Sequence, residues 1–116
     1  MLDGITIWYA IRPHVMPFLQ RLSNSFELVL FTTAVAGYAN FFFQLLNQQT
    51  GGLLSHFLHR DHCVHIYKGT FLKPLELVKD RELSKVLLLD NSAVSFGFNL
   101  DNGIPVTTWR GDPNDC

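Results

Sequence analysis

The sequence predicts an α/β layer fold with a mainly parallel sheet, flanking helices and a small β-hairpin. Two short apolar runs, ELVLF at Glu27–Phe31 and KVLLL at Lys85–Leu89, are bounded by polar residues, which is typical of strands buried on both faces of a parallel sheet. Helical patterns alternate with these runs, and such alternation favours a parallel sheet. The length of 116 residues, 47% of them hydrophobic and 16% charged, predicts one small domain over residues 1–116.

The N-terminal third is expected to contain a strand and then a helix. Ile5–Ile11 alternates and is rich in β-branched and aromatic residues, which indicates a strand. Pro13 can open a helix, because proline is tolerated in the first turn. The apolar stripe of that helix has members at i, i+3, i+4 and i+7, namely Val15, Phe18, Leu19 and Leu22, and the helix is expected to end near Ser23.

The remaining elements follow the same reasoning. Tyr38–Leu46 has helical spacing, and the polar and glycine residues at Gln48–Gly52 end it. Cys63–Tyr67 and Thr70–Leu72 flank a Lys-Gly pair and predict a hairpin. A further helix is expected before Lys85, and Ile104–Thr108 is a candidate last strand.

Composition excludes several classes of protein. The net charge is −1 and the basic residues are scattered, which argues against nucleic-acid or anionic-membrane binding. Cys63 and Cys116 do not form a disulfide framework, and neither a membrane segment nor a signal peptide is expected in this chain. We expect an intracellular protein; the sequence does not indicate an oligomeric state.

Polar side chains follow three of the predicted strands. Thr32 ends the first apolar run, Asp90 and Asn91 end the second, and Lys73 follows the hairpin. Ligands of open α/β sheets bind at the carboxyl ends of strands, so these residues are candidates for one site. A hydroxyl, a cation and an oxygen ligand for Mg²⁺ are what phosphoryl transfer requires. Taken singly, Thr32 is more often a helix N-cap and Lys73 more often a solvated surface lysine, while Asp90 is a turn or cap residue as often as a site residue.

Two other patterns give weaker evidence for a functional site. Histidines recur every three residues beside Cys63, at His56, His59, His62 and His65, but the second half of this run is expected to be extended, which scatters the imidazoles. We therefore do not favour a zinc site there. The ten phenylalanines, including Phe18 and Phe41–Phe43, are assigned to core packing rather than to base stacking.

Several blocks of the chain resemble a known family. RPHV, VLFTTAVAGYAN, HRDHCV, KGTFLK, KVLLLDNS and LDNGIPVTTW are similar, in order and spacing, to blocks of the small C-terminal-domain phosphatases. These are RNA polymerase II C-terminal-domain phosphatases of the NLI-interacting factor-like family, in the haloacid-dehalogenase superfamily. The resemblance covers about nine-tenths of the chain and implies a haloacid-dehalogenase-like (Rossmann-like) fold.

The resemblance also implies roles for single residues. Thr32 would hydrogen-bond the transferring phosphoryl group, and Lys73 would neutralise its charge. Asp90 would hold Lys73 and the water shell of the metal, and Asn91 would coordinate Mg²⁺. In the complete family domain a first aspartate becomes phosphorylated and a second, two residues later, is the general acid and base.

Tyr38 and Arg60 match positions that line the phosphopeptide groove of the family, which implies a phosphorylated protein tail or peptide as partner. Two positions depart from the family pattern: Pro74 stands where an Asp usually follows the lysine, and Ala93 where a Pro usually follows Asp-Asn-Ser. We therefore expect Lys73 to be aimed slightly differently from its family counterpart.

The nucleophile of the family is absent from the sequence. None of the ten acidic residues forms an Asp-x-Asp pair, so covalent catalysis has no starting point, and the first sheet strand is expected to be missing with it. We interpret the chain as an N-terminally truncated, incomplete domain, inactive as given. The alternatives are the presequence-receptor subunit of the mitochondrial inner-membrane translocase, or a non-catalytic scaffold of the same fold. A nuclear or cytoplasmic location follows from the first interpretation.

Overall fold

The computed structural model describes residues 9–77 and 81–115, and the chain divides into two compact units. The first unit comprises residues 1–59 and 109–116, and the second comprises residues 60–108. Among the described residues, three two-stranded sheets are present, of which two are parallel and one is antiparallel. An α/β fold with short parallel strands and few helices is therefore confirmed.

Within the described residues, the α-helices are α1 (Val15–Leu22) and α2 (Ala36–Thr50), and both belong to the first unit. Both were predicted, although α1 begins two residues after Pro13 and α2 extends to Thr50. Gly51 ends α2 with a φ of 79°, a left-handed conformation that glycine adopts without steric cost, and its N–H donates to the carbonyl of Asn47. The assignment of Phe18 to the core is wrong, because this residue is 45% exposed.

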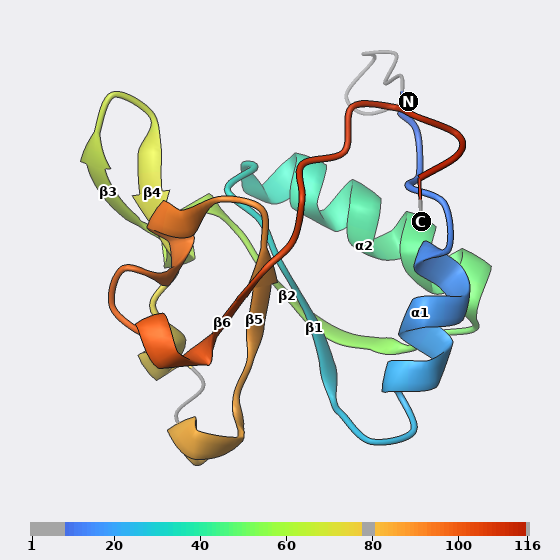
Figure 1. The fold of residues 1–116 in the computed structure, drawn as a ribbon, viewed down its shortest axis with the longest axis horizontal. Coiled ribbons are helices and arrows are strands. Elements are labelled where there is room, and N and C mark those ends of the chain that lie inside the picture. The colour runs from blue at the N-terminus through green and yellow to red at the C-terminus, as the bar shows by residue number, and fades with distance from the viewer. Residues whose placement is uncertain (1–8, 78–80, 116) are drawn as a thin grey trace. The chain divides into compact units, whose positions relative to one another are not determined.

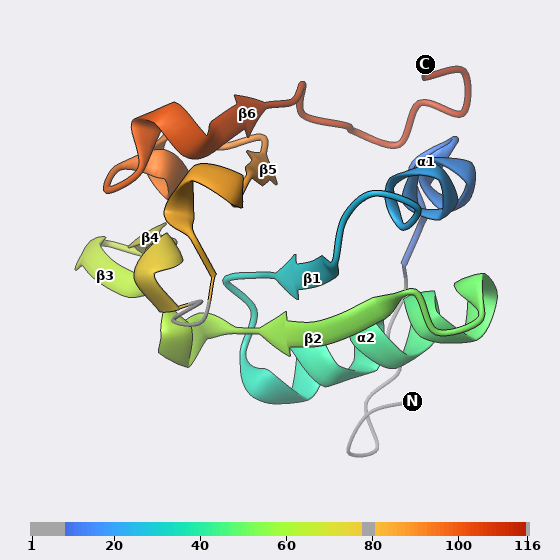
Figure 2. The same ribbon diagram turned by 90° about the horizontal axis from the view of Figure 1, so that it is seen from below.

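Helix α2 connects two parallel strands, β1 (Leu28–Phe31) and β2 (Leu54–Leu58). Figures 1 and 2 show α2 running alongside this strand pair, and Ala39 of the helix and Leu54 of β2 are buried where the elements pack. The prediction of β1 is confirmed. Strand β2 was not predicted, because Ser55 and His56 interrupt its apolar residues.

The strand predicted at Ile5–Ile11 lies mostly outside the described residues. Its described part, residues 9–11, has no strand conformation. Further along this segment, the guanidinium of Arg12 donates from Nε to Oδ2 of Asp115 over 2.5 Å and from Nη2 to Oδ1 over 3.2 Å. The segment before α1 is thereby joined to the last described residue of the chain.

The second unit begins with the predicted hairpin, β3 (Val64–Tyr67) and β4 (Thr70–Leu72), which pair antiparallel. The turn residues Lys68 and Gly69 have φ angles of 35° and 78°. Two successive positive φ angles are characteristic of the tight turns that match the twist of a hairpin. The hairpin prediction is therefore confirmed.

The second unit also contains a parallel pair, β5 (Leu88–Asp90) and β6 (Gly103–Pro105). Both strands are shorter than predicted. The helix expected between the hairpin and β5 is wrong for the described residues, which form 3₁₀ turns at Leu75–Leu77 and Leu83–Lys85. Two more 3₁₀ turns, Ala93–Phe96 and Leu100–Asn102, link β5 to β6.

The expectation that the apolar strands are buried on both faces is wrong. Val29 of β1 is 38% exposed and Leu89 of β5 is 40% exposed, whereas Leu88 is buried. Successive side chains of a strand point to opposite faces of its sheet, so the exposed Val29 and Leu89 mark a face that packing within their own units leaves open. The small core of the second unit consists of Leu75, Leu88 and Phe96.

Candidate functional site

Lys73 and Asp90 form a buried ion pair in the second unit. Lys73 directly follows β4 and Asp90 is the last residue of β5, so both stand at strand ends, as the sequence predicted. Nζ of Lys73 donates to Oδ2 of Asp90 over 2.5 Å, and each side chain is only 8% exposed. Charges withdrawn from water in this way require mutual pairing, so the two side chains hold one another in place.

The other carboxylate oxygen of Asp90 is also engaged. Oδ1 accepts the N–H of Ser92 over 2.9 Å, and the carbonyl of Asp90 accepts the N–H of Val106 over 3.1 Å. Side-chain-to-backbone bonding two residues ahead is an Asx turn, which fixes the carboxylate relative to the chain. Because each carboxylate oxygen has two lone pairs, acceptor capacity remains for a further ligand.

Asn91 supplies a second oxygen beside this carboxylate. Its Nδ2 donates to Oγ1 of Thr108 over 3.1 Å, which leaves Oδ1 as the atom suited to a cation. Mg²⁺ binds one or two carboxylates together with waters and phosphate oxygens, so the oxygens of Asp90 and Asn91 fit part of its coordination shell. The described residues include no group of three or more His, Cys, Asp or Glu side chains that could hold a metal unaided.

Arg60 lies in the 3₁₀ turn Arg60–His62 that precedes the hairpin, and it is exposed. Its guanidinium carbon lies 5.2 Å from the centroid of the Phe71 ring, a cation–π arrangement that orients the charge. Phe71 is two residues before Lys73. The predicted substrate-binding cation is thus positioned by the strand that leads to the buried lysine.

Cys63 belongs to the surroundings of the same ion pair, and the sequence analysis did not identify it as a site residue. Burial raises the pKa of its thiol above the ordinary value, while the charges of Lys73 and Arg60 act in the opposite direction and Asp90 adds to the increase. The signal in the sequence was its position between Arg60 and β3, which matters only once the hairpin has formed.

Thr32 and Tyr38 lie in the first unit. The N–H of Thr32 donates to the carbonyl of Leu58 at the end of β2, and its Oγ1 accepts the N–H of Ala34 over 3.1 Å. Thr32 therefore makes a turn before α2 and is not its N-cap, which is Val35. Tyr38 is half-buried in the first turn of α2. The predicted site is thus described as two halves, with only Lys73, Asp90, Asn91 and Arg60 in the second unit.

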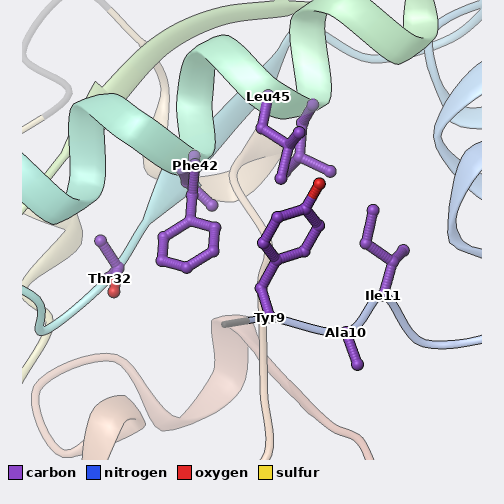
Figure 3. Close-up of a pocket in the computed structure, with 8 residues that line it drawn as sticks. Tyr9, Ala10, Ile11, Thr32, Phe42 and Leu45 are labelled. Carbon is purple, nitrogen blue, oxygen red and sulfur yellow. The ribbon is translucent and has the colours of Figure 1, made fainter. Parts of the chain in front are cut away.

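A mainly apolar cavity of about 260 Å³ lies in the first unit beside Thr32. Figure 3 shows the ring of Tyr9 directed toward α2, with Phe42 between it and Thr32. The complete lining is Tyr9, Ala10, Ile11, Leu30, Thr32, Phe42, Leu45 and Leu46. The Thr32 hydroxyl is therefore at the border of an apolar hollow.

The histidines of the periodic run have separate surroundings. Nε2 of His56 is 3.8 Å from Oε1 of Glu27 in the first unit, whereas Nε2 of His65 accepts the N–H of Gly69 within the hairpin. In the described part of the chain these imidazoles do not meet in a metal-binding group. His56 lies in β2, His59 just after it, His62 in a 3₁₀ turn and His65 in β3.

Comparison with known proteins identifies the family. The model of the NLI interacting factor-like phosphatase family matches residues 3–116. The chain belongs to this family. The family of phosphatases that the sequence motifs resemble is therefore confirmed.

Individual proteins similar to this NLI interacting factor-like phosphatase chain carry phosphatase names as well. The chain is 38% identical over 109 residues to CTD small phosphatase-like protein 3 of Caenorhabditis elegans, covering 94% of this chain. It is 42% identical over 104 residues to the human CTD small phosphatase-like protein, covering 90% of this chain. It is 39% identical over 116 residues to human carboxy-terminal domain RNA polymerase II polypeptide A small phosphatase 1, covering 98% of this chain. The chain spans 37%, 36% and 43% of the length of these relatives, respectively.

No described helix of this phosphatase-family chain combines the length and the apolar character needed to cross a bilayer.

Proposed function

We propose that this chain carries the phosphate-binding and Mg²⁺-binding part of a haloacid-dehalogenase-type phosphoprotein phosphatase domain. The observation that carries the proposal is the buried Lys73–Asp90 pair, with its nitrogen and oxygen 2.5 Å apart at the ends of β4 and β5. A hydrophobic or simply structural site would not need a desolvated cation held by a carboxylate, because such a pair gains little net stability. The family match supports the same chemistry.

In this proposal each residue has a distinct task. Lys73 neutralises the charge of a phosphoryl group, and the hydroxyl of Thr32 donates a hydrogen bond to one of its oxygens. Asp90 holds Lys73, and the oxygens of Asp90 and Asn91 hold Mg²⁺, which when bound would offset the negative charge of the phosphoryl oxygens. Such charge compensation and positioning supply most of the catalysis in phosphoryl transfer.

Tyr38 and Arg60 are proposed to bind the peptide around the phosphorylated residue. Arg60 can form paired hydrogen bonds with a phosphate or carboxylate because its guanidinium has a planar fork of donors. The substrate class is a phosphorylated protein tail or peptide, in the nucleus or cytoplasm. Nothing in the comparisons supports the mitochondrial import receptor, and the family and the relatives described above are phosphatases by name.

The chain as given is proposed to bind phosphate without turnover. It contains no Asp-x-Asp pair, and an aspartyl-phosphate mechanism requires that nucleophile. With Mg²⁺ and a generic phosphomonoester, the chain should release no phosphate above background. A longer version carrying an Asp-x-Asp strand upstream of Met1 should be active; equal activity of the two versions would contradict this part of the proposal.

Binding can be tested separately from turnover. In a ³¹P NMR titration with inorganic phosphate and Mg²⁺, Lys73→Met should weaken binding by about tenfold or more, which corresponds to about 1.4 kcal/mol. The matched control is Lys85→Met, because Lys85 has a 78% exposed side chain and pairs with Glu82 at 3.6 Å. Equal affinity in the two variants would exclude Lys73 as the phosphate-binding cation and would favour a non-catalytic scaffold.

A further inference from the structure

The residue after Lys73 poses a structural problem. Pro74 has no N–H and restricts the backbone of the residue before it, so regular hydrogen bonding cannot continue through this point. Strand β4 ends at Leu72, which pairs with Val64 of β3. The backbone that presents the buried Lys73 side chain is therefore beyond the hairpin ladder and must be held by another segment.

The loop after β5 provides that support on both sides of Pro74. The N–H of Lys73 donates to the carbonyl of Ser95 over 3.1 Å, and the N–H of Leu75 donates to Oδ1 of Asn99 over 3.1 Å. Ser95 and Asn99 are 4% and 8% exposed, so both bonds are shielded from water. The two donors that flank the proline are both paired with one loop.

Asn99 uses the other half of its amide as well. Nδ2 donates to Oε1 of Glu76 over 3.1 Å, and the backbone N–H of Asn99 donates to the carbonyl of Phe96 over 2.7 Å. Phe96 packs with Leu75 in the core of the second unit. The backbone of Asn99 is therefore fixed by the loop, and its side chain hydrogen-bonds to the two consecutive residues after Pro74.

The same loop also holds the partner of Lys73. Its first residue, Ser92, donates its N–H to Oδ1 of Asp90. Residues 92–99 thus bond to Asp90 at one end and to the chain on either side of Pro74 at the other. Close approach reinforces this: a Cβ on Gly97 would come within 2.3 Å of Cδ2 of Leu72, the residue before Lys73.

We propose that Asn99 is a positioning residue, which holds the backbone after Pro74 so that the Lys73 ammonium stays on Asp90. The inference rests on the proposed function only for the phosphate-binding role given to Lys73. The placement of Asn99 beside Lys73 follows directly from its hydrogen bonds with Leu75 and Glu76. Asn99 touches no reacting group in this proposal, and it acts through Lys73.

The test measures the accessibility of the Lys73 amine in the full chain. Lysines are acetylated briefly with an excess of reagent and quantified by mass spectrometry, with the exposed Lys85 as the internal standard. Leucine is similar in size to asparagine but its side chain makes no hydrogen bonds, so Asn99→Leu removes both hydrogen bonds of the side-chain amide. In this variant the ratio of Lys73 to Lys85 labelling should rise at least fivefold. A ratio unchanged from wild type would overturn the proposal.

The matched control is Asn102→Leu. Nδ2 of Asn102 donates to the carbonyls of Leu83 and Val86, both over 2.8 Å, so this variant also loses two amide hydrogen bonds of the second unit. Its labelling ratio should stay at the wild-type value. A rise as large as that of Asn99→Leu would show general loosening of the unit and would refute a specific role for Asn99.

Two variants that exchange the carboxylate and the amide between positions 99 and 76 keep the test decisive if Asn99→Leu does not fold. Asn99→Asp retains the acceptor for Leu75 but sets two carboxylates together at Glu76, so the labelling ratio should rise. The double variant Asn99→Asp/Glu76→Gln exchanges donor and acceptor and should restore the wild-type ratio; failure to restore it would contradict the proposal. Phosphate titration of the wild-type chain is independent of this readout, so loss of the proposed function and loss of the Asn99 role are distinguished.

Discussion

Each of the two compact units is stabilised internally by a different kind of hydrogen bond. In the first unit, described helices α1 and α2 and the pair β1–β2 are stabilised mainly by backbone bonds of regular elements. In the second unit, short strands and 3₁₀ turns are joined by side chains such as those of Asn99 and Asn102, which bond to the backbone of segments 16 to 24 residues away. Regular elements depend on local residue patterns, whereas these links depend on the whole arrangement of the unit.

Asn47 makes the comparison sharper. It is the corresponding amide of the first unit, with Nδ2 donating to the carbonyl of Leu54 over 3.1 Å and Oδ1 accepting the Leu54 N–H over 2.8 Å. Its partner is only seven residues away, across the end of α2. The side-chain amide of Asn47 in the first unit therefore joins residues that are close in sequence. The side-chain amides of Asn99 and Asn102 in the second unit join segments that meet only on folding.

The largest expected effect is from Asp90→Asn, which leaves the Lys73 ammonium buried without its charge partner. The free energy of unfolding should fall by about 3–5 kcal/mol in urea titrations. Hydrogen exchange should accelerate at residues 70–76 and 86–106, while protection of α2 changes little. Equal loss of protection in both units would show that they are not separate in stability.

Two controls accompany this variant. Asp101→Asn removes an exposed carboxylate of the same unit and should change the free energy of unfolding by less than about 0.5 kcal/mol. The double variant Lys73→Met/Asp90→Leu replaces both charges by apolar groups and should recover most of the loss, because desolvation of the ions no longer has to be offset.

A smaller effect is expected from Asn47→Ala in the first unit. Both backbone groups of the buried Leu54 would lose their partners, which costs about 1–3 kcal/mol. Asn40→Ala is the control, since Asn40 is exposed on the same helix and alanine favours helix. Faster exchange should be confined to residues 47–58; an effect of Asn40→Ala as large as that of Asn47→Ala would trace the loss to helix propensity instead.

The smallest effect is expected for the partly buried pair of Arg12 and Asp115 in the first unit. Hydrogen bonding from Arg12 holds the pKa of the Asp115 carboxyl below its ordinary value. The pair therefore stabilises the fold at pH values above the ordinary carboxyl range, about 4, and this contribution is lost as the pH falls through the lowered pKa. In ¹³C NMR titrations, Arg12→Gln should move the Asp115 midpoint upward, and an unchanged midpoint would contradict the assignment.

The sequence anticipated elements whose residues form a local pattern. The stripe of α1, the spacing of α2 and the Lys-Gly turn of the hairpin were all sufficient for prediction. Strand β2 escaped because Ser55 and His56 break its apolar run, and the burial of β1 and β5 was overestimated because apolar runs do not tell how many layers cover them. The helix expected before β5 failed because 3₁₀ turns there are held by distant side chains such as that of Asn102.

For the candidate site, the sequence by itself determined which chemical groups are available: a lysine and an aspartate at strand ends, and no Asp-x-Asp pair. Only the tertiary structure decided that the pair of Lys73 and Asp90, which the family resemblance implied, is buried, and that Ser95 and Asn99 bond to the chain on either side of Pro74. The physical reason is distance along the chain. Partners 17 to 24 residues apart leave no local periodicity, and their contact exists only when the hairpin, β5 and the following loop have packed together.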